Sequence, residues 1–359
     1  MMTIKKIIII AGGSGGHVFP GLAIAMHLIK KGWNIKWIGT RDRIESKLVP
    51  KHGIDINFIN IQGLRNATLK TILCLPINVI NAIYNIRKII KIWSPDIALT
   101  MGGYVSGPGG LAAWCSQIPL LIHEQNQVPG LTNQWLSRIS TKNMQAFSGT
   151  LKDAKTVGNP IFKNIINIPS PKYRFENRIG PLRILVVGGS QGASILNDTL
   201  PKVSKILKNK IIIWHQVGSL DFKKITMRYR QLGVNNVYCI TDFIDDMAVA
   251  YKWADLIICR SGALTVSEIS VVGLAAIFVP YPHKDQQQYK NAKNLKNIGA
   301  AKIINQSVFN TELIVKLLHS LTREKLFDMA KKAYSLGIRD STEKISEIIY
   351  KTIKTHKIN

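Results

Sequence analysis

Two glycine-rich loops, each directly behind a run of aliphatic residues, constrain the fold of this chain more than any other feature. Residues 7–17 read Ile-Ile-Ile-Ile-Ala-Gly-Gly-Ser-Gly-Gly-His, and residues 184–192 read Ile-Leu-Val-Val-Gly-Gly-Ser-Gln-Gly. A buried parallel strand reads as a continuous aliphatic run, and glycines behind it let backbone N–H groups approach a phosphate at the start of the next helix. Because the second loop begins near the middle of the 359 residues, we predict two similar α/β domains that bind phosphate-bearing ligands.

Strand-like and helix-like segments alternate on both sides of this division. Such alternation favours parallel sheets, with ligands at the carboxyl ends of the strands. The polar stretch 169–181 is interpreted as a linker or as an early loop of the second domain. The predicted strands cover residues 7–11, 35–39, 97–100, 120–123, 183–187, 211–216, 237–240, 256–259 and 276–279, and the first predicted helix covers 18–31.

Charge and composition limit the partners. A formal charge of +27 would attract nucleic acid, anionic lipid headgroups or acidic substrates, although a chain rich in Lys, Ile and Asn throughout also arises from an AT-rich genome. No recognition helix, aromatic platform or basic tail indicates a nucleic-acid site. The four cysteines form no CxxC pair, which indicates reduced thiols. The longest apolar stretch, 271–280, is shorter than the roughly 18 residues of a membrane helix, so we expect the chain at most to lie on a membrane.

Taken alone, either glycine loop is a weak signal. The first lacks the third glycine of a dinucleotide fingerprint, and no clear acidic residue closes the second strand, where residues 39–42 read Gly-Thr-Arg-Asp. A nicotinamide-dependent dehydrogenase is therefore an alternative with little support.

Five motifs in one order are much more specific, and through them the chain resembles the MurG family of bacterial glycosyltransferases, from about residue 5 to the C-terminus. Members of that family move N-acetylglucosamine (GlcNAc) from UDP-GlcNAc onto undecaprenyl-diphosphoryl-MurNAc-pentapeptide, turning lipid I into lipid II in peptidoglycan synthesis. Another lipid glycosyltransferase of the same fold, such as a galactolipid synthase, is the nearer alternative. The motifs are Gly-Gly-Ser-Gly-Gly-His-Val-Phe-Pro-Gly at 12–21, Met-Gly-Gly-Tyr-Val-Ser-Gly-Pro-Gly-Gly at 101–110, His-Glu-Gln-Asn at 123–126, Gly-Gly-Ser-Gln-Gly-Ala at 188–193 and Ser-Gly-Ala-Leu-Thr-Val-Ser-Glu at 261–268.

The resemblance implies an α/β fold of the GT-B type, two Rossmann-like domains with parallel sheets facing across a cleft. Residues 1–162 would bind the acceptor and the membrane, residues 163–340 would bind UDP-GlcNAc, and a helix within 341–359 would pack back on the first domain. The implied reaction is an inverting displacement that forms a β-1,4 linkage, without a cofactor or an essential metal. The implied location is peripheral, on the cytoplasmic face of the inner membrane.

The donor site is expected mainly in the second half. Ser261 follows a predicted strand and can cap a helix whose free N–H groups and dipole favour a diphosphate. Glu268, two turns on, can accept both ribose hydroxyls, the role its counterpart has in the family. Ser190 would bind phosphate, and the backbone of Ile244 would contact uracil. The other donor contacts implied by the resemblance are Ser14, Gly15, Gly16, Asn126, Ala263, Leu264, Thr265, Val266, Ser267, Gln287 and Gln288.

Two adjacent carboxylates, Asp245 and Asp246, suggest a metal site. We favour helix capping instead, because no third ligand is evident.

Two residues compete for the role of general base. His17 stands at a predicted helix start, where the positive end of the helix dipole would keep its imidazole neutral and able to take a proton. Glu124 is the alternative, and the sequence does not choose between them. By the resemblance, Gly102, Gly103 and Tyr104 would bind the diphosphate of the lipid acceptor.

One position departs from the family pattern. The family has Gly-Asn-Pro-Val-Arg at the domain junction, with the arginine as a donor contact, whereas residues 158–162 read Gly-Asn-Pro-Ile-Phe. Phe162 makes no charged contact, so either Lys163 replaces the arginine or the donor site is weakened.

The segment 71–84 is more apolar than one helix face requires, and Lys and Arg residues flank it. An apolar surface rimmed by cations suits an anionic membrane interface, although an ordinary core helix has a similar composition. We expect Ile72, Leu75, Val79 and Trp114 to contact the membrane.

Overall fold

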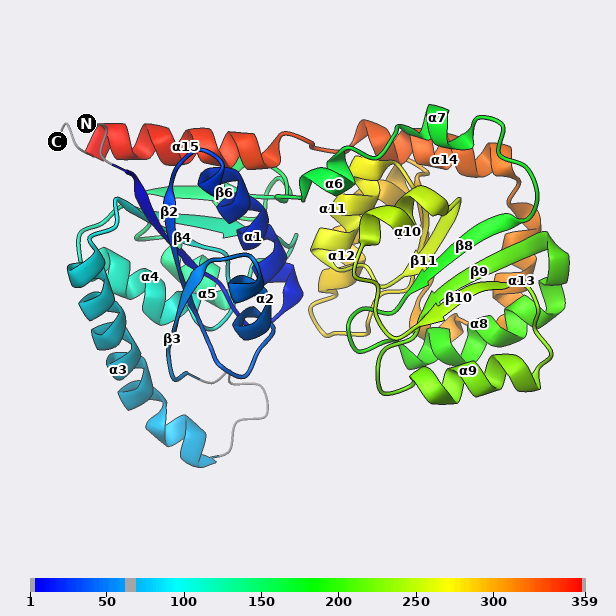
Figure 1. Cartoon of the computed structure of the whole chain (residues 1–359), viewed down its shortest axis with the longest axis horizontal. Helices are drawn as coiled ribbons and strands as arrows, with labels where there is room; N and C mark the ends of the chain where they lie inside the picture. Colours follow the sequence, from blue (N-terminus) through cyan, green and yellow to red (C-terminus); the bar gives the residue numbers. More distant parts are fainter. Residues whose placement is uncertain (1–3, 62–68, 357–359) are drawn as a thin grey trace. The chain divides into compact units, whose positions relative to one another are not determined.

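The structure is a computed structural model that describes residues 4–61 and 69–356, with side chains from residue 76 onward in the second range. The chain divides into two compact units (Figure 1). The N-terminal unit holds residues 1–162 and 339–359, and the C-terminal unit holds residues 163–338.

The N-terminal unit is an α/β domain. Its strands are β1 (Lys6–Ile10), β2 (Asn34–Gly39), β3 (Asp55–Phe58), β4 (Ile97–Thr100), β5 (Leu120–Glu124), β6 (Lys142–Gln145) and β7 (Lys155–Thr156). Its helices are α1 (Gly15–Ile29), α2 (Glu45–Lys51), α3 (Leu69–Trp93), α4 (Ser106–Cys115), α5 (Leu131–Leu136) and α15 (Ser341–His356). Over the described residues, the strands form one parallel sheet in the order β3-β2-β1-β4-β5-β6-β7.

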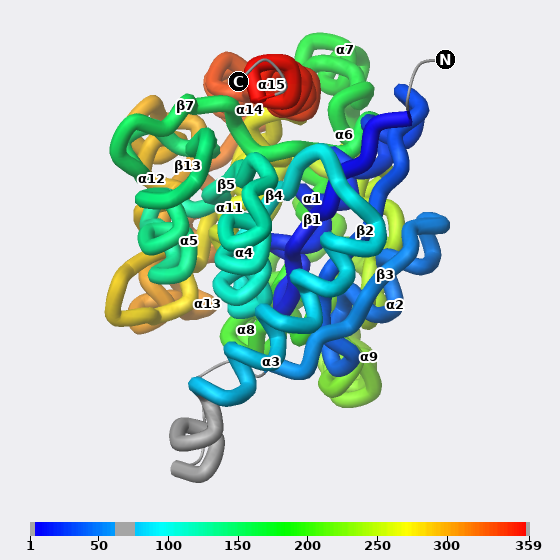
Figure 2. The backbone as a smooth tube through the Cα atoms, turned by 90° about the vertical axis from the view of Figure 1, so that its left-hand side faces the viewer, coloured from blue at the N-terminus to red at the C-terminus, as the bar shows by residue number. Residues whose placement is uncertain are grey.

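The central strand β1 is aliphatic because both of its faces are covered. Ile7 and Ile9 pack in a core cluster with α1 and α15, whereas Ile8 and Ile10 pack in a second cluster with α3 and α4. Successive strand residues point to opposite faces, so a strand covered on both sides has no position for a polar residue. Helices α3 and α4 lie side by side on their face of the sheet (Figure 2).

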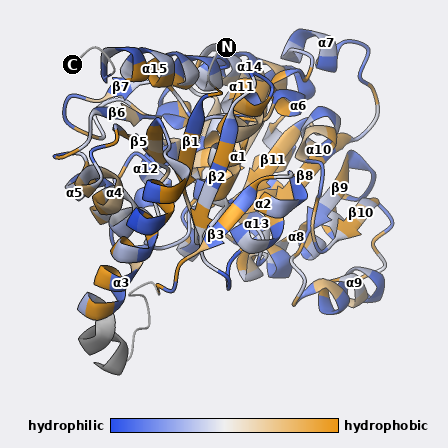
Figure 3. Ribbon diagram, turned by 60° about the vertical axis from the view of Figure 1, so that its left-hand side comes forward, coloured by the Kyte–Doolittle hydropathy of each residue, from blue (hydrophilic) through white to orange (hydrophobic). Residues whose placement is uncertain are grey.

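The C-terminal unit repeats this architecture. Its strands are β8 (Leu182–Val187), β9 (Ile211–Gln216), β10 (Val237–Thr241), β11 (Leu256–Cys259), β12 (Ala275–Phe278) and β13 (Ala301–Ile303). Its helices are α6 (Lys163–Ile166), α7 (Pro171–Phe175), α8 (Ser194–Leu207), α9 (Phe222–Gln231), α10 (Met247–Trp253), α11 (Ala263–Val272), α12 (Gln287–Asn297), α13 (Thr311–Ser320) and α14 (Arg323–Ser335), with 3-10 turns at Lys208–Lys210 and Gln306–Val308. The parallel sheet has the order β10-β9-β8-β11-β12-β13, and apolar residues concentrate in the strands (Figure 3).

The prediction of two similar α/β domains is confirmed, and each predicted strand lies within one residue of the observed one at either end. The first helix begins at Gly15, three residues before the predicted start, because the glycine loop itself forms its first turn. The stretch 169–181 is not a linker. It contains α7, which packs on α14, and its Arg174 is buried and donates to the carbonyls of Val272 and Gly273.

In the part of the chain that the structure describes, no helix combines the length and the apolar character needed to cross a membrane.

Candidate active site

In each unit the glycine loop and the loop that follows the neighbouring strand lie where the chain reverses its direction of travel across the sheet. From β1 the chain moves to β2 on one side and later to β4 on the other, and β8 stands in the same way between β9 and β11. Loops at the carboxyl ends of the two central strands leave in opposite directions there, which is the usual ligand position in open α/β sheets. In the N-terminal unit these loops are residues 12–16 and 101–105, and in the C-terminal unit they are residues 188–193 and 260–262.

His17 lies in the first turn of α1, as predicted. Its Nδ1 is 2.9 Å from Oε1 of Gln125, which follows β5. Its ring packs on the loop behind β4, where a Cβ atom added to Gly102 would lie 2.9 Å from the ring. Gly102 and Gly103 have φ of +92° and +83°, values that favour glycine. Two loops, the one after β4 and the one after β5, therefore hold this imidazole.

Glu124 is buried at the end of β5, and its carboxylate is fully used inside the unit. Oε1 accepts hydrogen bonds from the backbone N of Asn126 at 2.9 Å and from its Nδ2 at 3.3 Å. Oε2 accepts from the backbone N of Gly130 at 3.1 Å and from Nδ2 of Asn133 at 2.8 Å. A carboxylate has about four lone-pair positions. Glu124 is therefore an organiser of the loop that carries Asn126.

A buried carboxylate that the sequence analysis missed lies behind the first glycine loop. Glu45 accepts from the backbone N of Gly13 at 3.1 Å, from the backbone N of Thr40 at 3.1 Å and from Thr40 Oγ1 at 2.8 Å. The Tyr104 hydroxyl lies 3.2 Å from the same Oγ1. The N–H of Gly13 therefore already donates to a protein carboxylate. A phosphate near this loop would instead accept hydrogen bonds from the N–H groups at the start of α1. The carboxylate that bonds to the end of β2 therefore comes from α2 and not from residues 39–42, and no local pattern in the sequence indicates it.

Phe162 has a packing partner on each side. Its ring lies edge-on to Phe19, with centroids 6.3 Å apart, and stacks on His52 at 6.3 Å. It adds to the core cluster of the N-terminal unit, whereas Lys163 begins α6 in the other unit. The aromatic residue at the junction therefore has a structural role that the sequence analysis did not anticipate.

The carboxylate of Glu268 is the most perturbed acid at the C-terminal site. It projects from α11, and the Tyr251 hydroxyl donates to its Oε2 at 2.7 Å. Burial raises the pKa of Glu268 from 4.5 to about 7, and the Tyr251 hydrogen bond acts in the opposite direction. A partly desolvated acceptor of this kind binds hydroxyl donors strongly when it is ionised.

The prediction that Ser261 caps α11 is wrong. The N-cap residue is Gly262, without a side-chain capping bond, and Ser261 is buried with no hydrogen-bond partner for its Oγ. Ser261 belongs to the end of the buried strand region, where its backbone carbonyl accepts from Nδ2 of Asn291. The helix dipole at the start of α11 does not depend on this cap.

Asp246 caps a helix, which confirms that prediction. Its Oδ1 accepts from the backbone N of Ala248 at 2.9 Å at the start of α10. Ile244, just before it, is buried, whereas Asp245 is exposed. Among the residues described, no group of three His, Cys, Asp or Glu side chains is arranged to hold a metal ion.

The loop that carries Ser190 is exposed, but two of its glycines are required by backbone packing. A Cβ atom on Gly188 would lie 2.3 Å from the backbone N of Ala193, and one on Gly192 would lie 2.0 Å from the carbonyl oxygen of Val217. Gly189, with φ of +92°, has no neighbour within 4 Å of such an atom. The positive φ of Gly189 by itself favours glycine at that position.

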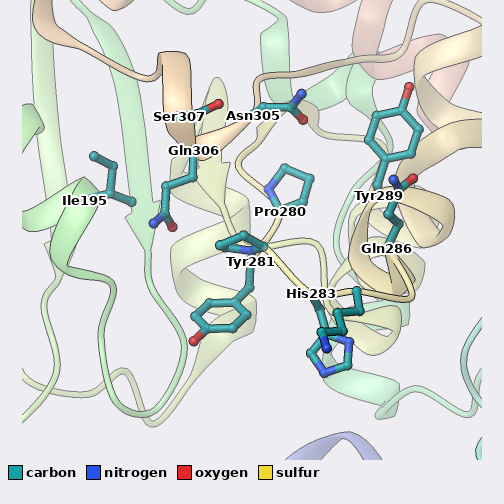
Figure 4. A pocket seen from close by; sticks show the side chains of 11 residues that line it. Ile195, Pro280, Tyr281, His283, Gln286, Tyr289, Asn305, Gln306 and Ser307 are labelled. Atoms are coloured by element: carbon teal, nitrogen blue, oxygen red, sulfur yellow. The ribbon is translucent and has the colours of Figure 1, made fainter.

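Gln287 and Gln288 begin α12 at the edge of a cavity of about 890 Å³ (Figure 4). Oε1 of Gln288 accepts from the backbone N of Tyr281 at 2.8 Å, so this side chain shapes the loop. None of the predicted site residues lines the cavity. Its lining is Ile195, Pro280, Tyr281, Pro282, His283, Lys284, Gln286, Tyr289, Asn305, Gln306 and Ser307.

Arg260 supplies a fixed positive charge beside this cavity, and the sequence analysis missed it. Its Nη2 donates to Oε1 of Gln306 at 2.7 Å, its Nη1 donates to the carbonyl of Val279 at 2.9 Å, and its guanidinium lies over the ring of Tyr281. The signal that could have found it is its position between β11 and the start of α11.

The expected membrane surface is partly described. Ile80, Tyr84 and Trp114 are 64%, 70% and 53% exposed on the neighbouring helices α3 and α4. Val79 is half-buried, and part of its side chain packs against the core cluster beneath α3. The side chains of Ile72 and Leu75 lie outside the described residues.

Both halves of the chain match models of one family. The glycosyltransferase family 28 N-terminal domain matches residues 7–145, and the C-terminal domain of the same family matches residues 183–348.

Related proteins cover nearly the whole chain. The UDP-N-acetylglucosamine–N-acetylmuramyl-(pentapeptide) pyrophosphoryl-undecaprenol N-acetylglucosamine transferase of Buchnera aphidicola subsp. Schizaphis graminum is 65% identical, over 97% of this chain and 98% of the relative. The transferase of the same description from Blochmanniella pennsylvanica is 54% identical, over 98% and 99%. The crystal structure of Acinetobacter baumannii MurG has a TM-score of 0.83 and 39% identity, over 97% of this chain and 99% of that one.

Proposed function

We propose that this chain, which belongs to glycosyltransferase family 28 along both domains, transfers GlcNAc from UDP-GlcNAc to the MurNAc of lipid I. The product is lipid II, the disaccharide precursor of peptidoglycan. The observation that carries this conclusion is the 65% identity over 97% of the chain to a transferase with this donor and this acceptor.

The C-terminal unit supplies the donor contacts in this proposal. Glu268, once ionised, accepts the ribose hydroxyls, and the start of α11 directs its positive dipole end at the diphosphate. The exposed loop at Ser190 adds a hydroxyl and backbone N–H groups. Charge develops on the departing UDP, so these dipoles stabilise the transition state more than the ground state. No resident cofactor or metal is part of the proposal, because the helix dipole and the N–H groups of these loops stabilise the charge of the diphosphate themselves.

The N-terminal unit supplies the acceptor contacts and the base. We assign general base to His17 because Glu124 already accepts four hydrogen bonds and is buried. The MurNAc 4-hydroxyl loses its proton to His17 while its oxygen bonds to C1 of GlcNAc, and the bond from C1 to the β-phosphate oxygen breaks. Displacement from the face opposite UDP gives the β-1,4 linkage. The loop at Gly102 and Gly103 accommodates the acceptor diphosphate.

The proposed location is the cytoplasmic surface of the inner membrane, with peripheral binding. Exposed apolar side chains on α3 and α4, among them Ile80, Tyr84 and Trp114, form an apolar surface. Arg87 and Lys88 are exposed on α3. Each basic residue near an anionic leaflet contributes about 1 kcal/mol to membrane binding.

One experiment tests substrate and reaction together. The purified chain is incubated with labelled UDP-GlcNAc and a short-chain lipid I analogue, and we expect a labelled disaccharide. An acceptor whose MurNAc 4-hydroxyl is replaced by hydrogen should give none. Release of UDP without disaccharide, or binding of NAD in place of UDP by calorimetry, would exclude the proposed function.

A further inference from the structure

A chain of hydrogen bonds runs from His17 into the interior of the N-terminal unit. His17 Nδ1 lies 2.9 Å from Gln125 Oε1, Gln125 Nε2 lies 3.1 Å from His123 Nδ1, and His123 Nε2 lies 2.9 Å from the carbonyl oxygen of Gly158. Gln125 and His123 are both buried. The proposed base therefore ends a polar chain that begins at a backbone group.

The far end of this chain sets the direction of its hydrogen bonds. The carbonyl of Gly158 can only accept, so the proton of the His123 ring is on Nε2. Burial lowers the pKa of His123 to about 4, so the ring is neutral near pH 7 and its Nδ1 carries a lone pair. That nitrogen then accepts from the amide of Gln125.

A second contact fixes the orientation of Gln125 independently. Its Nε2 also donates to the backbone carbonyl of His123 at 3.1 Å. Exchanging the amide nitrogen and oxygen would place two carbonyl oxygens against each other and lose both donors. Oε1 of Gln125 therefore faces His17 and, as an acceptor, requires an N–H on His17 Nδ1.

We propose that Gln125, held by His123, is a positioning residue that keeps neutral His17 protonated at Nδ1, so that Nε2 is the atom that receives the proton of the acceptor hydroxyl. The assignment of Nε2 as proton acceptor rests on the proposed function. The tautomer itself does not. The ring of His17 packs on the glycines at 102 and 103, which restrict its rotation. The hydrogen bond to Gln125 Oε1 then determines which ring nitrogen is protonated.

The tautomer is measurable without substrate. In the full-length wild-type protein labelled with 15N-histidine, NMR correlations between ring carbon-bound protons and ring nitrogens distinguish a protonated Nδ1 from a protonated Nε2. A His17→Gln variant identifies the His17 signals among those of the eight histidines. We expect Nδ1–H and a bare Nε2.

Gln125→Leu keeps the approximate side-chain volume but removes both the acceptor Oε1 and the donor Nε2. We expect the His17 signals to shift toward the Nε2–H form. We also expect kcat to fall by about ten- to a hundredfold or more, because an Nε2–H tautomer presents a proton instead of a lone pair to the acceptor hydroxyl and weakens general-base catalysis. The KM for UDP-GlcNAc should stay within about twofold, because the donor contacts of the C-terminal unit are unchanged.

Gln145→Leu is the matched control. Gln145 is a buried glutamine at the end of the neighbouring strand β6, and its amide bonds to Ala154, Thr150 and Leu151. This variant should leave the tautomer of His17 and kcat unchanged.

The proposal is overturned if wild-type His17 is protonated at Nε2, or if Gln125→Leu changes the tautomer and kcat no more than Gln145→Leu does. The wild-type spectrum decides the first point even if Gln125→Leu does not fold. A well-folded wild-type protein that shows Nδ1–H but makes no disaccharide supports the hydrogen-bond chain and counts against the proposed function.

Discussion

Replacing Glu268 by Gln should make the C-terminal unit more stable above pH 7 while weakening donor binding. The folded state raises the pKa of this carboxyl from 4.5 to about 7, which corresponds to about 3 kcal/mol for complete ionisation. Part of the side chain reaches solvent, so we expect about 1–3 kcal/mol. Gln removes the cost of a desolvated charge and keeps an oxygen that accepts from Tyr251.

The pH dependence has a defined sign. Because the folded state binds the proton of Glu268 more tightly than the unfolded state does, the contribution of this group to stability is present below pH 4.5 and is lost as pH rises to about 7. The gain from Glu268→Gln should therefore be near zero at pH 4.5, grow up to pH 7 and stay constant above it.

Urea unfolding of the wild type and the variant at a series of pH values measures the difference in unfolding free energy. Calorimetry with UDP-GlcNAc measures the affinity for the donor. Losing a charged acceptor costs about 1.5–3 kcal/mol of binding, so affinity should fall by roughly tenfold to a hundredfold. Glu176→Gln, an exposed acid of the same unit, should change neither quantity. A variant that is less stable at pH 8, or a gain independent of pH, would refute the reasoning about burial. Unchanged donor affinity would remove Glu268 from the site.

Three further changes separate the other roles. Gly102→Ala places a Cβ 2.9 Å from the His17 ring at a φ of +92°, so kcat should fall by about tenfold or more at unchanged UDP affinity; normal turnover would contradict the packing of the ring on this loop. Phe162→Ala should lower the unfolding free energy by about 1–3 kcal/mol, since a partly buried aromatic ring is lost, and an unchanged melting temperature would argue against its role in the core. Ile80→Ser should reduce binding to anionic vesicles without changing the melting temperature, whereas Ile86→Ser, in the core on the same helix, should lower the melting temperature; the reverse pattern would remove α3 from the membrane surface.

The strands and the glycine loops could be read from the sequence because their causes are local. A strand covered on both faces must be aliphatic at every position, as 7–10 and 184–187 are, and the turn behind it must end that run. The same reasoning predicted where His17 and Ser190 lie, because carboxyl-terminal loops of neighbouring parallel strands meet at one edge.

Contacts made across the fold escaped this reasoning. Nothing local in the sequence indicates that Glu45 closes the loop at Gly13, that Phe162 packs between two rings, or that the hydroxyl of Ser261 is buried rather than capping a helix. The packing of part of Val79 against the core also escaped it, because helical periodicity does not say which side of a helix meets the sheet until its neighbours are in place.

The sequence by itself determined two parallel α/β units, their order along the chain and the set of chemically able residues, since these follow from the periodicity and the turn chemistry of residues adjacent in the chain. Only the tertiary structure decided which of those residues act together. Gln125 orients His17 across 108 positions of the sequence, and the return of α15 lets Tyr350 accept a hydrogen bond from Trp33, 317 positions away. The free energy of such contacts depends on packing that no local pattern encodes, because each partner is brought into reach only when the sheet and its covering helices have formed.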